Sequence, residues 1–264
     1  MERKTNLYHC TNIRALVSIL NSKHFRYSYC LEKYDGLTNG FGDDEIAYAM
    51  ICFADLYSNE LYSHMKQFGS DSYILMDKVW AMKNRVCPVI YYHKNSASNI
   101  AYLHIAKCAV KLFSKKQDGI EEILFKSVEL FRPFFKKYEG KYFIKGTDQV
   151  SSESVEFFLE REWRSFPMVK NYEHHCLSKQ EFFNETLKFQ ATKELVDHGY
   201  VLEFAWDDIL KLGCKEQKKD EVIKAIVNSF GINKEDAQMK IEIISDSDNV
   251  KVDENEQVLA TKSN

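Results

Sequence analysis

Two acidic residues, Glu160 and Glu162, stand in the segment EREWR, where their type and spacing could support chemistry. Alternate residues of an extended chain point to the same side, so both carboxylates would share one face. Two like charges in contact repel, and at least one carboxyl group then needs a cationic partner or an altered pKa. Paired carboxylates suit a reaction with a cationic transition state, since they stabilise an oxocarbenium ion and orient a hydroxyl group. The alternative is a solvated edge strand with charge-paired neighbours.

The opening segment LYHCT contributes a second candidate, His9, at the end of an expected strand and just before an expected helix. A histidine in this place can donate a hydrogen bond to a ribose hydroxyl or a phosphate, while the free backbone N–H groups of the helix add to the site. The alternative is a half-buried histidine in an ordinary strand-to-helix turn. Thr11 is expected to cap the helix that follows.

A third candidate site lies between residues 132 and 145, where five basic residues and one acid are interleaved with aromatic residues. Cations follow a nucleic-acid backbone, and aromatic rings stack on bases. The candidate nucleic-acid contacts are Arg132, Lys136, Lys137 and Lys141. The alternative is the solvated end of a helix.

No metal site is predicted. His174, His175 and Cys176 are adjacent, and adjacent ligands rarely converge on one ion. The seven cysteines are odd in number and contain no C-x-x-C motif, which favours free thiols in a reducing compartment. A nuclease is disfavoured, because no cluster of Asp, Glu and His offers convincing metal ligands.

The composition is that of a folded protein that contains helices. Hydrophobic residues make up 45% of the 264 residues, and 10 Gly with 3 Pro fall well below the ordinary share of about 12%. This shortage argues against a sandwich of many tight hairpins and against a glycine-rich phosphate loop. With a net charge of −3, the chain lacks the excess of basic residues that is typical of a dedicated DNA-binding domain. No apolar run approaches the roughly 18 residues of a membrane helix, so we expect a cytoplasmic protein without membrane association.

Patterns of apolar residues predict the elements that must position these side chains. Strands are expected at residues 5–10, 25–31, 46–54, 86–92, 141–145, 200–204 and 239–244, with a mostly extended segment at 154–167. Helices are expected after Thr11, at 77–84, twice within 97–137, and at 178–196, 207–212 and 216–230. Strands grouped without regular strand–helix alternation predict an α+β fold.

The predicted organisation is one domain of residues 1–214, enlarged by a helical insertion at about 97–140, and a C-terminal extension of residues 215–264. The extension is expected to hold a helix, a strand and a loose acidic tail, in which residues 246–256 carry five acids and one lysine. The tail and the helix at 216–230 are candidate docking elements for a partner.

Five segments resemble a known family in their order along the chain: LYHCTNIRALVSIL, FRYSYCLE, AMICFADL, SHMKQFGSDSYILMDKVWAMKNRVCPVIYY and EREWRS. This order is similar to that of the AbiGi-type abortive-infection proteins of bacterial phage defence. The resemblance covers about residues 5–95 and 150–250. The strand–His–helix opening and the late Glu-x-Glu also resemble the ADP-ribosyltransferase fold, including the DarT-like toxins with an opening similar to Tyr-His-x-Thr. That fold implies a split β-sheet core.

The transferase resemblance implies that NAD is a co-substrate and assigns binding residues to it. His9 would bind the adenosine ribose, with Thr11 beside it. Tyr27 or Tyr29 would pack on the nicotinamide, and Phe53 would form the floor of the pocket.

The same resemblance implies a role for each of the two acids. Glu162 would hold the nicotinamide ribose 2′-hydroxyl and stabilise the oxocarbenium ion, and Glu160 would orient or deprotonate the acceptor. The implied function is an NAD-dependent mono-ADP-ribosyltransferase that acts as the toxin of a phage-defence system. Its acceptor would be a nucleic acid, with RNA preferred, or a protein, and a cognate antitoxin or other neutralising protein would be its partner.

A second hypothesis comes from a different class of protein. The AbiGi-type name has also been attached to an antitoxin role, which needs no catalysis. The chain would then be a non-catalytic antitoxin or scaffold of the same defence system, harmless when overexpressed and able to rescue cells from a toxin.

Overall fold

The structure is a computed structural model that describes residues 6–34, 37, 44–113, 120–144, 147, 149–167 and 176–245. These residues form two compact units, each made of several stretches of the chain. The first unit draws on Met1–Arg26, Cys52–Cys87 and Val201–Asn264, and the second on Tyr27–Ile51 and Pro88–Tyr200. Both units combine strands with helices, which confirms the predicted α+β class. Residues 214 and 215, on the two sides of the predicted domain boundary, both belong to the first unit.

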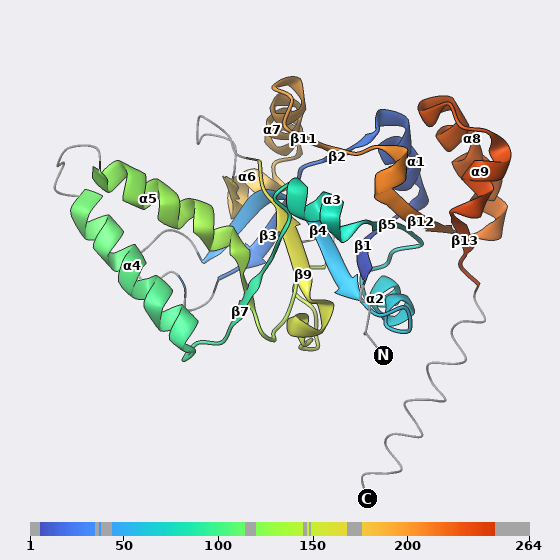
Figure 1. Ribbon diagram of the computed structural model, residues 1–264. Coiled ribbons are helices and arrows are strands. Elements are labelled where there is room, and N and C mark those ends of the chain that lie inside the picture. Colours follow the sequence, from blue (N-terminus) through green and yellow to red (C-terminus); the bar gives the residue numbers. More distant parts are fainter. Residues whose placement is uncertain are drawn as a thin grey trace, which may run out of the picture. The chain divides into compact units, whose positions relative to one another are not determined.

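The elements of the first unit come from both ends of the chain and from its middle (Figure 1). They are β1 (Asn6–Thr11), α1 (Ile13–Ser22), β2 (His24–Arg26), α2 (Leu61–Gln67), β5 (Ser72–Met76), α3 (Lys78–Lys83), β11 (Val201–Glu203), η4 (Trp206–Asp208), β12 (Ile209–Cys214), η5 (Glu216–Lys218), α8 (Lys219–Phe230), α9 (Lys234–Met239) and β13 (Ile241–Ile243). Two strands, β4 (Glu45–Leu56) and β6 (Cys87–Pro88), contain residues of both units.

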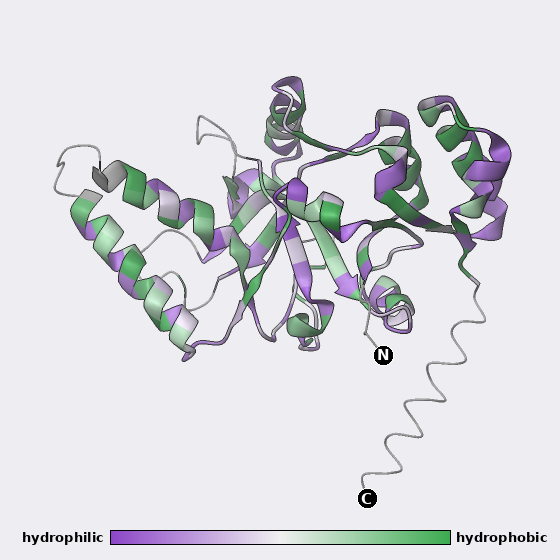
Figure 2. Ribbon diagram, viewed as in Figure 1, coloured by the Kyte–Doolittle hydropathy of each residue, from purple (hydrophilic) through white to green (hydrophobic). Residues whose placement is uncertain are grey.

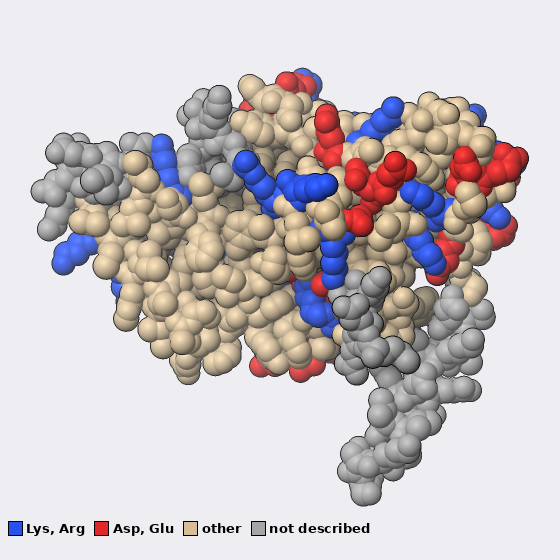
Figure 3. All heavy atoms as spheres, viewed as in Figure 1, with Lys and Arg blue, Asp and Glu red and all other residues tan. Residues whose placement is uncertain are grey.

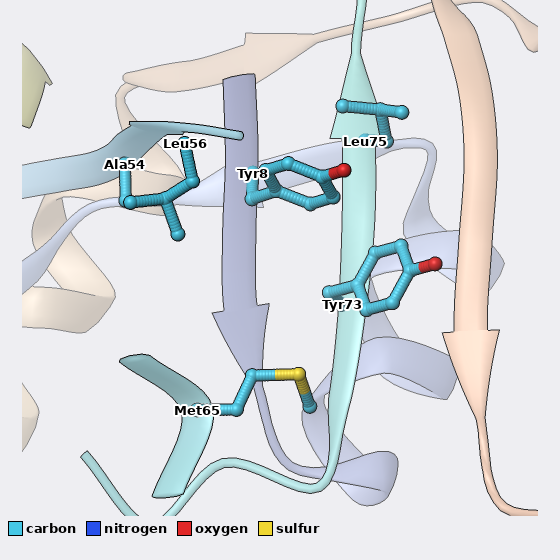
Figure 4. Close-up of a cluster of buried hydrophobic side chains, with 6 residues drawn as sticks. All are labelled: Tyr8, Ala54, Leu56, Met65, Tyr73 and Leu75. Atoms are coloured by element: carbon cyan, nitrogen blue, oxygen red, sulfur yellow. The ribbon is translucent and has the colours of Figure 1, made fainter. Parts of the chain in front are cut away.

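The sheet of the first unit is built around β1. This strand pairs antiparallel with β5 and with the last residues of β4, and β5 in turn pairs antiparallel with β12, which pairs parallel with β13. Alternate residues of these strands share a face. One face carries the buried cluster in Figure 4, which consists of Tyr8, Ala54, Leu56, Met65, Tyr73 and Leu75. The other face carries His9 and Phe53, whose rings lie 5.5 Å apart.

The two long helices of the first unit pack against each other. Helix α1 begins after Asn12, whose side chain accepts a hydrogen bond from the N–H of Ala15, so Asn12 is the cap and the prediction of Thr11 was wrong by one residue. Helix α8 confirms the amphipathic helix predicted at 216–230, with Val222 and Ile226 fully buried. Its apolar face is therefore covered by the unit to which it belongs.

The second unit contains shorter strands and the two helices that were predicted within 97–137. Its elements are β3 (Ser28–Lys33), β7 (Ile90–Tyr92), α4 (Ala97–Phe113), α5 (Ile120–Phe131), η1 (Arg132–Phe134), β8 (Phe135–Lys137), η2 (Phe157–Glu160), β9 (Glu162–Ser165), β10 (Cys176–Ser178), α6 (Lys179–Phe183) and α7 (Glu185–Asp197). Strands β3 and β10 pair antiparallel with β4, and β7 pairs parallel with β8. Helices α4 and α5 pack side by side (Figure 1).

The predicted helix at 207–212 was wrong. The chain makes one 3-10 turn at η4 and then enters the strand β12. Ile209 and Leu212 are both buried, and a spacing of three residues is typical of a helix. Here a shift of register between Ile209 and Lys211, opposite β5, produces the same spacing in a strand.

A further prediction was wrong in the second unit. The expected strand at 141–145 is reduced, in its described residues, to an isolated bridge between Phe143 and Val150, and the strand of this region is β8. The segment 154–167, predicted to be mostly extended, contains the 3-10 helix η2 at residues 157–160 and then the strand β9. His174, His175 and the acidic tail lie outside the described residues. Within the described part of the chain, no helix has both the length and the apolar character needed to cross a bilayer.

Candidate functional site

Five charged side chains meet inside the second unit and form what we call the charge cluster: Glu32, Lys136, Glu160, Glu162 and Arg164. They come from β3, β8, η2 and β9, which are far apart in the chain. Arg164 is completely buried and Glu162 is 4% exposed. Charges are buried at a large free-energy cost unless they are paired, so the partners of each group decide what the cluster can do.

Lys136 contacts both of the carboxylates that were predicted to be catalytic. Its Nζ lies 2.5 Å from Oε2 of Glu162 and 3.2 Å from Oε2 of Glu160. Burial lowers the pKa of Lys136, but the two carboxylates raise it by more, so the net pKa lies above its usual value and the ammonium group stays charged. The repulsion between the two acids is therefore offset by a cation that they share.

Arg164 provides the second cation of the cluster. Its Nε donates to Oε1 of Glu162 at 2.7 Å and its Nη2 donates to Oε2 of the same carboxylate at 3.0 Å. The outer edge of the guanidinium binds both carboxylate oxygens of Glu32, with Nη1 at 2.9 Å from Oε2. Nη1 also donates to the backbone oxygen of Pro133 at 2.7 Å. Such planar, two-pronged pairing is specific to arginine.

The backbone turns sharply between the two acids. Glu160 is the last residue of η2, Glu162 is the first of β9, and Arg161 between them has φ 44° in the left-handed region. A residue other than glycine rarely adopts this conformation. The acids do lie together as predicted, but this turn and the shared Lys136 bring them together, and not the side-by-side geometry of a strand.

The two acids differ in their pKa. Burial raises the pKa of Glu162, but Arg164 and Lys136 oppose this more strongly and hold it well below the usual range. The pKa of Glu160 is raised, because burial and the charge of Glu162 outweigh the attraction of Lys136. The Oε1 atom of Glu160 is buried and has no hydrogen-bond partner. Glu162 is therefore the ionised member of the pair, and Glu160 is the one that binds a proton more readily.

The residues predicted to bind NAD belong to both units, and each group is described within its own unit. In the first unit, Nδ1 of His9 donates to the backbone oxygen of Cys52 at 2.9 Å, and the His9 ring packs edge-on against Phe25 at 5.0 Å. Phe53 is 1% exposed, and Thr11 is the last residue of β1. His9 and Phe53 are thus brought together, inside an aromatic core.

In the second unit, the two predicted tyrosines are also buried. The hydroxyl of Tyr27 lies 2.9 Å from Oγ of Ser165, on β9, and Tyr29 on β3 is 7% exposed. Burial raises the pKa of Tyr29. Each oxygen of Glu162 already accepts a hydrogen bond from Arg164 or Lys136, and the residue is 4% exposed. Of the predicted NAD-binding residues, His9 and Tyr27 are thus hydrogen-bonded within the protein, and Phe53 and Tyr29 are buried.

The predicted nucleic-acid contacts are also affected by burial. Arg132 is 1% exposed and lies over the Tyr34 ring at 4.9 Å, and Lys136 is enclosed by the charge cluster. A nucleic-acid contact through either cation therefore stays a prediction, and each is already paired within the protein. Lys137 is half-buried and Lys141 is exposed. No group of three or more His, Cys, Asp or Glu side chains in the described residues could hold a metal ion.

Three members of this site were missed from the sequence. Arg164 stands two residues after Glu162, and strand alternation could have indicated that the two share a face. Glu32 contacts Arg164 across 132 residues, and no local pattern signals such a pair. The hydroxyl oxygen of Tyr91 accepts a hydrogen bond from the backbone N–H of Glu162 at 2.8 Å, and nothing in the sequence around Tyr91 signals this contact.

Comparison with known proteins gives one family match, which covers residues 23–212 and thus more than half of the chain. The family is described as "Putative abortive phage resistance protein AbiGi, antitoxin". No curated protein and no solved structure matches the chain. The description contradicts the predicted ADP-ribosyltransferase toxin and agrees with the alternative of an antitoxin. The predicted resemblance to AbiGi-type proteins is confirmed, and the chain belongs to the AbiGi family of abortive phage resistance proteins.

Proposed function

We propose that this chain is a non-catalytic antitoxin of a bacterial abortive-infection system, which binds a toxin and thereby neutralises it. The observation that carries the proposal is the family match over residues 23–212 and its description as an antitoxin. A protein of this kind acts by forming an interface, so it needs a stable fold and a surface that fits the toxin.

The charge cluster supports a structural role for the residues that looked catalytic. Lys136 and Arg164 neutralise the carboxylate of Glu162 from two sides, and both cations come from the chain itself. A catalytic carboxylate has to reach a substrate, whereas Glu162 is 4% exposed and accepts hydrogen bonds from Lys136 and Arg164. The cluster joins β3, β8, η2 and β9, and in this proposal it holds these short elements in place.

The toxin prediction is not kept, because the family that the chain belongs to is described as an antitoxin. An ADP-ribosyltransferase-like arrangement of the strands and a site for NAD both stay predictions. The antitoxin proposal needs neither of them.

The experiment is to place the gene for this chain under a repressible promoter in its own host and to follow growth after the promoter is shut off. We expect growth to stop as the chain is depleted, because the toxin is then released, and a plasmid copy should restore it. Unchanged growth after depletion overturns the proposal, and so does growth arrest on overexpression of this chain alone in an unrelated bacterium.

A further inference from the structure

Helix α4 buries little apolar side chain. Its buried positions, among the residues described, are Asn99, Tyr102, Ala106 and Ala109. One of these is polar, and each of the two alanines buries a single methyl group. The large aliphatic side chains of Ile100, Ile105 and Leu112 are exposed instead. Because the burial of apolar area is the main force that holds a helix to its protein, α4 gains little from its packing.

Helix α5 is similar. Among its described side chains Val128 alone is buried, whereas Ile123 is 68% exposed and Phe131 is also exposed. Figure 2 shows hydrophobic positions along the length of both helices, and in the view of Figure 3 few charged atoms lie over their described parts. Helix α8, which is as long as α5, buries four residues: Val222, Ile223, Ala225 and Ile226. The described parts of α4 and α5 thus keep much of their apolar surface outside any core.

The two helices pack chiefly against each other. Helix α4 packs on α5, and α5 packs in addition on η1, which directly follows it in the chain. Figure 1 shows the pair side by side, with the ends that face residues 114–119 extending away from β3, β7 and β9 of the same unit. A movement of one helix would therefore carry the other with it.

The attachment of α4 to the strands of its unit depends on one aromatic contact. The ring of Tyr102 lies 4.8 Å from the ring of Phe135 on β8, measured between centroids, and both residues are buried. Two polar atoms oppose this contact, because the hydroxyl of Tyr102 and Oδ1 of Asn99 are buried without a hydrogen-bond partner among the described residues. A buried polar atom without a partner costs free energy, which is recovered when the atom reaches water.

We propose that α4 and α5 form an opening unit, in which both helices separate together from β8 while β3 and β4 stay paired. Segments with few buried apolar contacts open at a lower free energy than the global unfolding of a protein, and neighbouring elements often open as one cooperative unit. Opening would bring the rings of Tyr102 and Phe135, which are now 3% and 2% exposed, into contact with water. The proposal does not depend on the antitoxin function.

The test is amide hydrogen exchange of the purified full chain, followed by mass spectrometry. We expect the amides of α4 and α5 to share one protection factor, at least about 10-fold below that of β4 at Ala47 and Ala49, which are fully buried. Equal protection in the two helices and in β4 would overturn the proposal.

Two variants of Tyr102 test the attachment. Tyr102→Ala removes the ring from Phe135 and should speed exchange in both helices by about 30-fold or more, with β4 unchanged. Tyr102→Phe keeps the ring and removes the unpaired hydroxyl, so it should slow exchange in both helices by about 5-fold or more. The matched control is Ile105→Ala, an exposed position of the same helix, which should change exchange by less than about 3-fold.

The variants also give results that would overturn the proposal. If Tyr102→Ala speeds exchange in β4 as much as in α4, or prevents folding, the helices open only when the whole unit unfolds. If it speeds exchange in α4 and leaves α5 unchanged, the two helices do not open together. Faster exchange in Tyr102→Phe would show that the hydroxyl stabilises the closed form, against the attachment described here.

Discussion

Glu162 and Arg164, two residues apart on β9, are joined by two hydrogen bonds, from Nε to Oε1 at 2.7 Å and from Nη2 to Oε2 at 3.0 Å. This pairing occupies both oxygens of a carboxylate that the sequence suggested as catalytic. Lys136 adds a third contact to the same group, at 2.5 Å. A buried carboxylate held in this way by two cations of its own chain stabilises the elements that carry them.

The first prediction concerns the cation that the two acids share. Lys136→Met leaves Glu160 and Glu162 buried without the shared ammonium group, and we expect a loss of about 3–5 kcal/mol in the free energy of unfolding. Chemical denaturation monitored by circular dichroism measures it. Lys141→Met removes an exposed lysine nearby and should change stability by less than about 0.5 kcal/mol. A loss that is equally small in both variants would contradict the structural role of the cluster.

The second prediction concerns acid stability and Glu162. Its pKa in the folded chain lies below the ordinary value of 4.5, so its ionised form contributes stability that is present above pH 4.5 and is lost as the pH falls further. Glu162→Gln should remove this contribution, lower stability at pH 7 by about 3–5 kcal/mol, and flatten the acid side of the profile. The measurement is a set of denaturation curves between about pH 3 and about pH 7, a range that includes the ordinary carboxyl pKa. A variant with an unchanged acid slope would argue against the ion pairs described here.

Glu160 should behave in the opposite way. Its pKa in the folded chain is raised, so its protonated form contributes stability that is present below pH 4.5 and is lost as the pH rises through the folded pKa. The Glu160→Gln variant should not lose stability in this way as the pH rises, because the amide has the same shape as the carboxyl group and does not ionise. Stability relative to the wild type should therefore improve steadily as the pH rises from about 5 to about 8. The measurement is the difference in denaturation midpoint between Glu160→Gln and the wild type at each pH. A difference that stays constant across this range would refute the raised pKa of Glu160.

A fourth prediction tests the sheet of the first unit. A methyl group added at Gly213 on β12 would lie 2.0 Å from the Tyr73 ring on β5, much closer than atoms can approach. Gly213→Ala should therefore cost about 1–3 kcal/mol of stability through overpacking. In a chain that already carries Tyr73→Ala the same change should cost little. A cost that is identical in both backgrounds would show that the ring is not the obstacle.

Local patterns predicted the helices whose apolar residues recur at helical spacing. Helix α1 and helix α8 follow from apolar residues at helical spacing, and Leu16 and Ile226 are fully buried as that spacing requires. The predicted helix at 207–212 was wrong, because a register shift in β12 buries Ile209 and Leu212 at a helix-like interval. Pairing between strands decides such cases, and it cannot be seen within a short window of sequence.

The candidate site was predictable only in part. The nearness of Glu160 and Glu162 was predicted from an extended strand, but it comes from the turn at the left-handed Arg161 and from the shared Lys136. The partners that set their chemistry lie far away in the chain: Lys136 is 26 residues from Glu162, and Glu32 is 132 residues from Arg164. The two carboxylates are buried beside cations that neutralise them, and the tertiary fold alone brings these cations near. The sequence pattern of two acids therefore could not show that the pair is internally neutralised.

A fifth prediction addresses the catalytic alternative directly. Incubation of the chain with labelled NAD and separate pools of RNA, DNA and protein should transfer no label, because a non-catalytic antitoxin has no transferase activity. Label that appears in one pool with the wild-type chain, and is lost with Glu160→Gln at unchanged stability, would restore the enzymatic hypothesis.

The most direct test of the antitoxin proposal is growth of the depleted host that carries either the wild-type chain or Glu160→Gln on a plasmid. Glu160→Gln keeps the shape of the cluster and removes the acid that a transferase would use. We predict that depletion stops growth and that both copies restore it equally. Continued growth of the depleted host, or rescue that is lost in Glu160→Gln while its fold is intact, would contradict a non-catalytic antitoxin.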